Sequence, residues 1–94
     1  MKSVIITGTS KGIGLETALA FSRAGYSVFA TMRNLEAAAA LQKTIASESL
    51  PIVIYQMDVD DDDSVKRCIA TIIKEHGKID VLVNNAGIER HGSV

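Results

Sequence analysis

The feature of this sequence that most restricts its fold is a regular alternation between short β-branched runs and longer stretches with helical spacing. The short runs, at 3–7, 27–31, 52–57 and 79–83, contain Val, Ile or Thr, as buried strands do. Each connection between consecutive runs contains a helical stretch, so the strands should be parallel with right-handed crossovers. This pattern predicts an α/β fold with sheet order 3-2-1-4, which is half of a doubly wound parallel sheet.

Three segments between these strands have the spacing of amphipathic helices. The first begins at Gly12 and stops at Gly25, which can adopt the left-handed conformation that ends helices. The second ends before Pro51, which cannot continue a helix, and the third ends at Gly77. The positions expected to pack on the sheet are Ile13, Thr17, Ala20, Phe21 and Ala24 in the first helix, Leu35, Ala38, Ala39, Leu41 and Ile45 in the second, and Val65, Cys68, Ile69, Ile72 and Ile73 in the third.

Composition and charge exclude several classes of partner and site. The 94 residues are 47% hydrophobic, which is enough for a packed core, and their net charge of −1 gives no field that attracts nucleic acid or anionic lipid. One cysteine excludes an internal disulfide framework and a multi-cysteine zinc site. No apolar run reaches the roughly 18 residues of a membrane span. We therefore expect a cytoplasmic protein with no nucleic-acid or membrane partner.

The first strand leads into a glycine-rich turn that opens the first helix, with the sequence TGTSKGIG at 7–14. Gly8 allows a sharp turn, Gly12 removes a side chain where backbone would approach a phosphate, and Gly14 lets the helix pack closely on the strand. Amide groups at the helix N-terminus would then face an anion. Glycines are also common in ordinary βα turns, so this motif alone is weak evidence. A P-loop is excluded, because Lys11 precedes Gly12 instead of following the last glycine.

Two further motifs lie at strand ends: Asp58-Val59 after the third strand and Asn84-Asn85-Ala86-Gly87 after the fourth. Together with Thr-Gly-x-x-x-Gly-x-Gly at 7–14, they make the chain resemble the short-chain dehydrogenase/reductase family over essentially its whole length. The resemblance implies that residues 1–94 are the N-terminal part of a Rossmann-type NAD(P)-binding domain, ending before the catalytic segment.

The resemblance also implies roles for individual residues. The carboxylate of Asp58 would accept a hydrogen bond from the adenine amino group, and Val59 would lie along that ring. Residues 84–87 would brace the sheet, with the backbone of the last two against the nicotinamide-side ribose. The residues expected to bind the cofactor are Gly8, Thr9, Ser10, Lys11, Gly12, Ile13, Gly14, Arg33, Asp58, Val59, Asn85, Ala86 and Gly87.

Cofactor preference is encoded after the second strand, where an NAD-preferring site places an acidic residue on the ribose 2′-hydroxyl. Here no carboxylate occurs until Glu36, whereas Arg33 and Lys11 could neutralise a 2′-phosphate. These residues favour NADP(H) over NAD(H). The alternative is that both cations are ordinary solvated surface residues.

The family's catalytic Tyr-x-x-x-Lys pair is not in these 94 residues, because Tyr26 is followed four positions later by Ala30 and Tyr55 by Val59. No catalytic residue is therefore assigned, and we expect this chain alone to be inactive. The resemblance implies a longer parent protein, which is expected to be a homo-oligomeric oxidoreductase that interconverts a small-molecule carbonyl and alcohol. Two alternatives stay open: a non-catalytic dinucleotide-binding or regulatory module on the same scaffold, and a receiver-like or flavodoxin-like interaction domain.

The remaining polar residues are expected to have structural roles. The acidic run at 60–63 precedes the third helix, so Asp62, Asp63 or Ser64 should lie near its N-cap, in preference to a cation site. Cys68 should be a small core residue, and His76 should lie at a helix C-terminus. His91 is expected in a loop, and no metal site is predicted.

Overall fold

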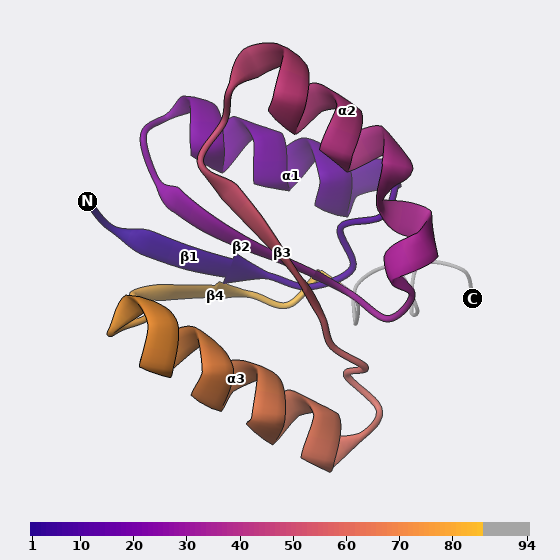
Figure 1. The fold of residues 1–94 in the computed structure, drawn as a ribbon, viewed down its shortest axis with the longest axis vertical. Coiled ribbons are helices and arrows are strands. Elements are labelled where there is room, and N and C mark those ends of the chain that lie inside the picture. Colours follow the sequence, from indigo (N-terminus) through magenta and orange to yellow (C-terminus); the bar gives the residue numbers. More distant parts are fainter. Residues whose placement is uncertain (86–94) are drawn as a thin grey trace.

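A computed structural model describes residues 1–85 and confirms the expected α/β fold with a parallel sheet. Its elements are β1 (Ser3–Ile6), α1 (Gly12–Arg23), β2 (Ser27–Met32), the 3₁₀ helix η1 (Leu35–Ala38), α2 (Ala39–Glu48), β3 (Ile52–Gln56), α3 (Asp62–His76) and β4 (Val81–Val83). All pairings are parallel and the strand order is β3-β2-β1-β4, as predicted. Helices α1 and α2 cover one face of the sheet and α3 covers the other (Figure 1). No helix within residues 1–85 is long and apolar enough to cross a membrane.

The sheet separates two apolar clusters, because successive strand residues point to opposite faces. Val4 and Ile6 pack on the side of α1 and α2, whereas Ile5 and Phe29 pack against α3. Strand β1 is therefore buried on both faces, with all four residues below 6% exposure. At the edge strand β4, Leu82 is 65% exposed. The face of the sheet to which Leu82 points is therefore not fully covered at this strand.

The face by which α1 packs on the sheet differs from the expected stripe. Its buried residues are Gly14, Ala18, Leu19 and Ser22, whereas Ile13 is 64% exposed. The small residues at 14, 18 and 22 recur every four positions and form a shallow surface, which lets the helix lie close to the strands. A prediction from hydrophobicity alone places the buried face on the neighbouring stripe of α1, because glycine and serine side chains contribute little apolar character.

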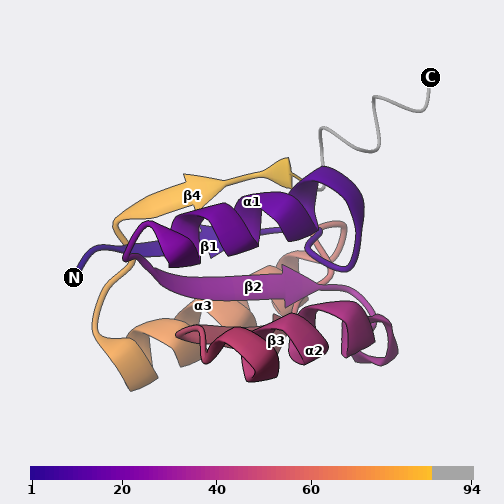
Figure 2. The same cartoon turned by 90° about the horizontal axis from the view of Figure 1, so that it is seen from above.

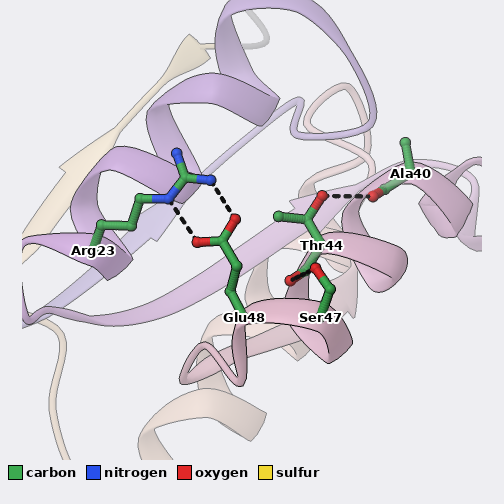
Figure 3. Close-up of polar contacts among 5 residues, drawn as sticks. All are labelled: Arg23, Ala40, Thr44, Ser47 and Glu48. Atoms are coloured by element: carbon green, nitrogen blue, oxygen red, sulfur yellow. Dashed lines mark hydrogen bonds and ion pairs between the residues drawn. The ribbon is translucent and has the colours of Figure 1, made fainter.

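The second helical segment begins as η1 and continues as α2, where the sequence predicted one helix. Asn34 caps η1, since its Oδ1 accepts from the backbone N–H of Glu36 at 2.9 Å. Arg23 at the end of α1 forms a two-point ion pair with Glu48 at the end of α2, with N–O distances of 2.9 and 2.6 Å (Figure 3). Both side chains are exposed, so this pair aligns two helix ends and contributes little to stability.

The acidic segment before α3 caps that helix, and residues 62–64 lie near the N-cap as expected; the capping residue itself is Asp61. The carboxylate of Asp61 accepts from the backbone N–H groups of Asp63 and Ser64 at 3.0 and 3.4 Å. Asp62 and Asp63 lie in the first turn, where negative charge complements the helix dipole. Ser64 instead accepts a hydrogen bond from the Asp58 N–H at 2.9 Å.

We expect Asp61→Ala to lower the free energy of unfolding by about 1 kcal/mol, because two N–H groups lose their acceptor. Chemical denaturation followed by circular dichroism measures this change. Asp62→Ala is the matched control, since that carboxylate acts only through the dipole and its loss should cost about half as much or less. Equal effects of the two variants would contradict the assignment of Asp61 as the cap.

Asp80 joins the beginning of β4 to the beginning of β1. Its Oδ2 accepts from the Ser3 backbone N–H at 2.8 Å and from Ser3 Oγ at 3.2 Å, and Lys78 Nζ lies 3.5 Å from Oδ1. The backbone hydrogen bond from Ser3 is the main cause of a lowered Asp80 pKa. This carboxylate therefore links the two segments most strongly in its charged form.

A carboxylate with a lowered pKa stabilises the fold fully above its unfolded pKa of about 4, and this stabilisation is lost as pH falls through the folded pKa. We expect the melting temperature of the wild type to fall more steeply below about pH 4 than that of Asp80→Asn. Thermal melts between pH 7 and pH 3 test this. Parallel curves for the two proteins would show that Asp80 carries no linked proton.

Candidate functional site

The carboxyl ends of the four parallel strands meet at one edge of the sheet, and the loops that carry the candidate site residues lie there. Figure 2 shows the strands pointing toward the side where the loop between β1 and α1 lies. This arrangement brings together the glycine loop at 8–14, Arg33 after β2, the segment 58–59 after β3 and the segment 84–85 after β4. In open α/β sheets, ligands bind at this edge beside the strand where the chain order reverses, here β1 and β4.

The glycine loop leads into a helix N-terminus that has no side-chain cap among residues 1–85. Gly8 and Gly12 have φ angles of 65° and 63°, which other residues rarely adopt, and these angles turn the chain from β1 into α1. The N-cap residue Lys11 makes no side-chain cap, and the first turn of α1 contains no acidic residue. The N-terminus of α3, in contrast, has both. The first amide groups of α1 are therefore suited to an anion from outside the chain.

Gly14 lies where α1 approaches the backbone of the loop closely. A Cβ atom at this position would lie 1.9 Å from the Gly8 carbonyl oxygen and 2.5 Å from Asn85 Nδ2. Asn85, which is 2% exposed, donates from Nδ2 to the same Gly8 oxygen at 3.1 Å. Thr7 Oγ1 donates to Asn84 Oδ1 at 3.2 Å, so both asparagines attach the end of β4 to the start of the loop.

A second set of contacts joins the loop to β2 and was missed by the sequence reasoning. The Thr31 carbonyl accepts from both the N–H and the Oγ1 of Thr9, at 3.1 and 3.0 Å, and both threonine side chains are fully buried. Thr31 Oγ1 donates in turn to the Ile6 carbonyl at 3.2 Å. The only signal available from sequence was a threonine at each of two neighbouring strand ends.

The two cations expected at the site are exposed and available. Arg33 and Lys11 lie on the surface, and none of the carboxylates in residues 1–85 forms an ion pair with either. Ser10, between the glycines, is partly exposed. The Arg33 carbonyl accepts from Gln56 Nε2 at 3.2 Å, so the turn after β2 is held from β3.

Asp58 and Val59 follow β3 at the same edge. Asp58 Oδ1 accepts from the Asp60 N–H at 3.0 Å, which closes a local turn, and Val59 packs partly buried on the α3 side of the sheet. Ala86, Gly87 and His91 lie outside the described residues. Within the described part of the chain, no group of three His, Cys, Asp or Glu side chains could hold a metal ion.

Ile13 lies on an open surface patch along the outer face of α1. The patch also includes Gly12, Glu16, Thr17 and Ala20, all from this one helix. It adjoins the glycine loop, since Gly12 and Ile13 belong to both. The exposed Ile13 is thus an apolar wall beside the uncapped helix N-terminus.

Three other side chains with chemical reactivity have structural contacts instead: Tyr55, Cys68 and His76. Cys68 is buried in the core, and burial raises the pKa of its thiol. His76 ends α3, as expected, and its ring lies 4.5 Å from that of Phe29. Tyr55 Oη contacts Glu75 Oε1 at 2.5 Å and His76 Nε2 at 2.9 Å, and burial is the main cause that raises its pKa to about 12. A phenol with a raised pKa is poorly matched to proton transfer at neutral pH.

Comparison with known proteins extends over nearly the whole chain. The family model described as short chain dehydrogenase matches residues 2–94. Retinol dehydrogenase 8 of Bos taurus is 44% identical over 92 residues, and a 3-oxoacyl-[acyl-carrier-protein] reductase of Staphylococcus aureus is 39% identical over 90 residues. These alignments cover 93% and 95% of this chain but 28% and 37% of the relatives, so the chain spans about a third of their length. A crystal structure of a variant actinorhodin polyketide ketoreductase with NADPH superimposes with a TM-score of 0.81 at 28% identity, covering 88% of this chain and 32% of that one.

Proposed function

Since the chain belongs to the short-chain dehydrogenase family, we propose that its glycine-rich edge binds NADP(H) within an oxidoreductase that interconverts a carbonyl and an alcohol. A nicotinamide dinucleotide supplies hydride transfer when it is bound. The observation that carries the proposal is the uncapped N-terminus of α1, with positive-φ glycines at 8 and 12 and a close backbone approach at Gly14.

The residues at this edge fit such a ligand. The amide groups at the start of α1 and the Lys11 ammonium would hold the pyrophosphate, because they combine a helix dipole with a full positive charge. Asp58 and Val59 would contact the adenine, and Ile13 would exclude water beside the loop. Asn85 would hold the glycine loop in place through Gly8, and the backbone of Ala86 and Gly87 would lie against the nicotinamide-side ribose. Arg33 would take the 2′-phosphate, which makes NADP(H) the favoured cofactor.

The activity and substrate belong to a protein of the length of the relatives. We expect residues 1–94 to form the cofactor-binding part and to lack turnover by themselves, since they contain no Tyr-x-x-x-Lys pair. The names of the relatives include a retinol dehydrogenase and a 3-oxoacyl reductase, which act on alcohol and carbonyl groups respectively. These names support a small-molecule carbonyl or alcohol as the substrate and do not distinguish one from another. A homo-oligomeric parent stays a prediction.

Calorimetric titration of the purified protein with NADPH and with NADH tests the proposal. We expect saturable binding of both and a lower Kd for NADPH. ATP serves as the control, because it shares the adenine and a phosphate chain but lacks the nicotinamide half. A protein that is folded by circular dichroism and binds neither dinucleotide would overturn the proposal.

A further inference from the structure

We infer that Thr9 and Gln56 are positioning residues that fix the turn carrying Arg33 relative to the glycine loop, and so set discrimination between nucleotides with and without a 2′-phosphate. The inference rests on the proposed function and deepens it. Neither residue needs to contact the 2′-phosphate itself. Each holds the backbone of the segment 31–33 from a different neighbouring element.

Thr9 is the contact from the glycine loop. Its N–H and Oγ1 both donate to the Thr31 carbonyl, at 3.1 and 3.0 Å, and its side chain is 0% exposed. Thr31 is also 0% exposed, and its Oγ1 donates to the Ile6 carbonyl at 3.2 Å. The end of β1, the glycine loop and the end of β2 are therefore joined through hydrogen bonds of two threonine side chains that are both buried. Buried hydrogen bonds of this kind have narrow geometry, because a shifted partner would be left unsatisfied.

Gln56 is the contact from β3. Its Nε2 donates to the Arg33 carbonyl at 3.2 Å, and one residue later the Met57 N–H donates to the Met32 carbonyl at 3.0 Å. The carbonyl groups of Met32 and Arg33 are thus both held by the end of β3 and the residue that follows it. The carbonyl group of Thr31, the preceding residue, is held by Thr9. The Arg33 side chain itself is exposed and has no carboxylate partner among residues 1–85.

This arrangement bears on specificity because the 2′-phosphate and the pyrophosphate are attached to the same ribose, which limits the distance between them. The two anions can be bound together only if the glycine loop and Arg33 lie at the matching separation. Loosening the 31–33 segment should weaken the contact at the 2′-phosphate more than the contact at the pyrophosphate. A misplacement of about 1 Å is enough to weaken a charge-assisted hydrogen bond substantially. NADPH affinity should therefore fall while NADH affinity is nearly kept.

Two variants remove one contact each and preserve shape. Thr9→Val removes the hydroxyl donor but keeps the branched side chain and the backbone N–H bond to Thr31, so the buried carbonyl stays satisfied. Gln56→Met removes the exposed amide donor without adding charge near Arg33. Thr9→Ser retains the hydroxyl and should rescue. The matched control is Thr44→Val in α2, which removes an Oγ1 bond to the Ala40 carbonyl of 3.3 Å (Figure 3).

The measurement is the ratio of the Kd for NADH to the Kd for NADPH, with the melting temperature of the unliganded protein recorded in parallel. We expect Thr9→Val and Gln56→Met to lower the ratio about five- to tenfold each, chiefly through weaker NADPH binding, and Thr9→Ser and Thr44→Val to change it less than twofold. A lower melting temperature with an unchanged ratio would reduce both residues to structural supports and overturn the inference.

The outcome also separates this inference from the proposed function. A wild-type protein that binds neither dinucleotide removes the proposed function and this inference with it. A wild type that prefers NADPH, with variants that keep the same preference, leaves the proposed function standing and overturns only the role of Thr9 and Gln56. A lower ratio in Gln56→Met would support the inference even if Thr9→Val failed to fold, because Gln56 lies on the surface.

Discussion

Replacement of Gly14 by alanine is expected to abolish nucleotide binding and to lower the free energy of unfolding by about 3 kcal/mol or more. The added Cβ would lie 1.9 Å from the Gly8 carbonyl oxygen, a backbone atom that cannot rotate away. It would also lie 2.5 Å from Asn85 Nδ2, whose hydrogen bond to that oxygen holds the loop. To accommodate one methyl group, α1 must move away from the loop that it opens.

A glycine can be required because a side chain would collide with neighbouring atoms or because the backbone has a positive φ angle. A comparison with Gly25 distinguishes these two reasons. Gly25 is the matched control, because it has a φ of 99° but no heavy atom within 4 Å of an added Cβ. Gly25→Ala should therefore cost only the conformational strain of about 1 to 2 kcal/mol and leave nucleotide affinity unchanged. Thermal melts and titration with NADPH measure both effects. A Gly14→Ala protein that binds NADPH with wild-type affinity would show that the loop is not the pyrophosphate site.

The strand order and the glycine loop could be predicted because they depend on local signals. Short β-branched runs separated by helical spacing determine parallel pairing, and the parallel pairing brings the strand ends to one edge. Positive φ at Gly8 and Gly12 follows from residue type at a sharp turn. These features require no knowledge of which atoms meet in three dimensions.

The features that sequence could not predict depend on packing between distant segments. The buried face of α1 was wrong because Gly14, Ala18 and Ser22 pack by being small, which a hydrophobic count does not register. The sequence placed the cap of α3 near residues 62–64 but could not single out Asp61, because four consecutive aspartates give the same local signal. The contact of Thr9 with Thr31 joins residues 22 apart and could be found only with the glycine loop and the end of β2 side by side.

Arg33→Asp is expected to reverse the cofactor preference. Loss of a charge-assisted contact with the 2′-phosphate should weaken NADPH binding roughly 10- to 100-fold. The new carboxylate repels the 2′-phosphate and can accept a hydrogen bond from the 2′-hydroxyl of NADH. Arg33 is suited to this role because it is exposed, has no ion-pair partner within residues 1–85 and is held through its backbone carbonyl by Gln56.

Two further variants distinguish a local contact from a general effect of charge. Lys2→Asp makes the same change of two charge units before β1, at the opposite end of that strand from the glycine loop, and should leave the ratio of the two Kd values within about twofold of the wild type. Arg33→Ala removes the cation without adding a carboxylate, so it should lose NADPH affinity and gain none for NADH. The salt dependence of NADPH binding should also become weaker in both Arg33 variants, because one fewer protein cation faces the phosphates. Similar Kd values for NADPH and NADH in the wild type, unchanged by Arg33→Asp, would mean that Arg33 is a solvated surface cation and that the preference for NADP(H) is wrong.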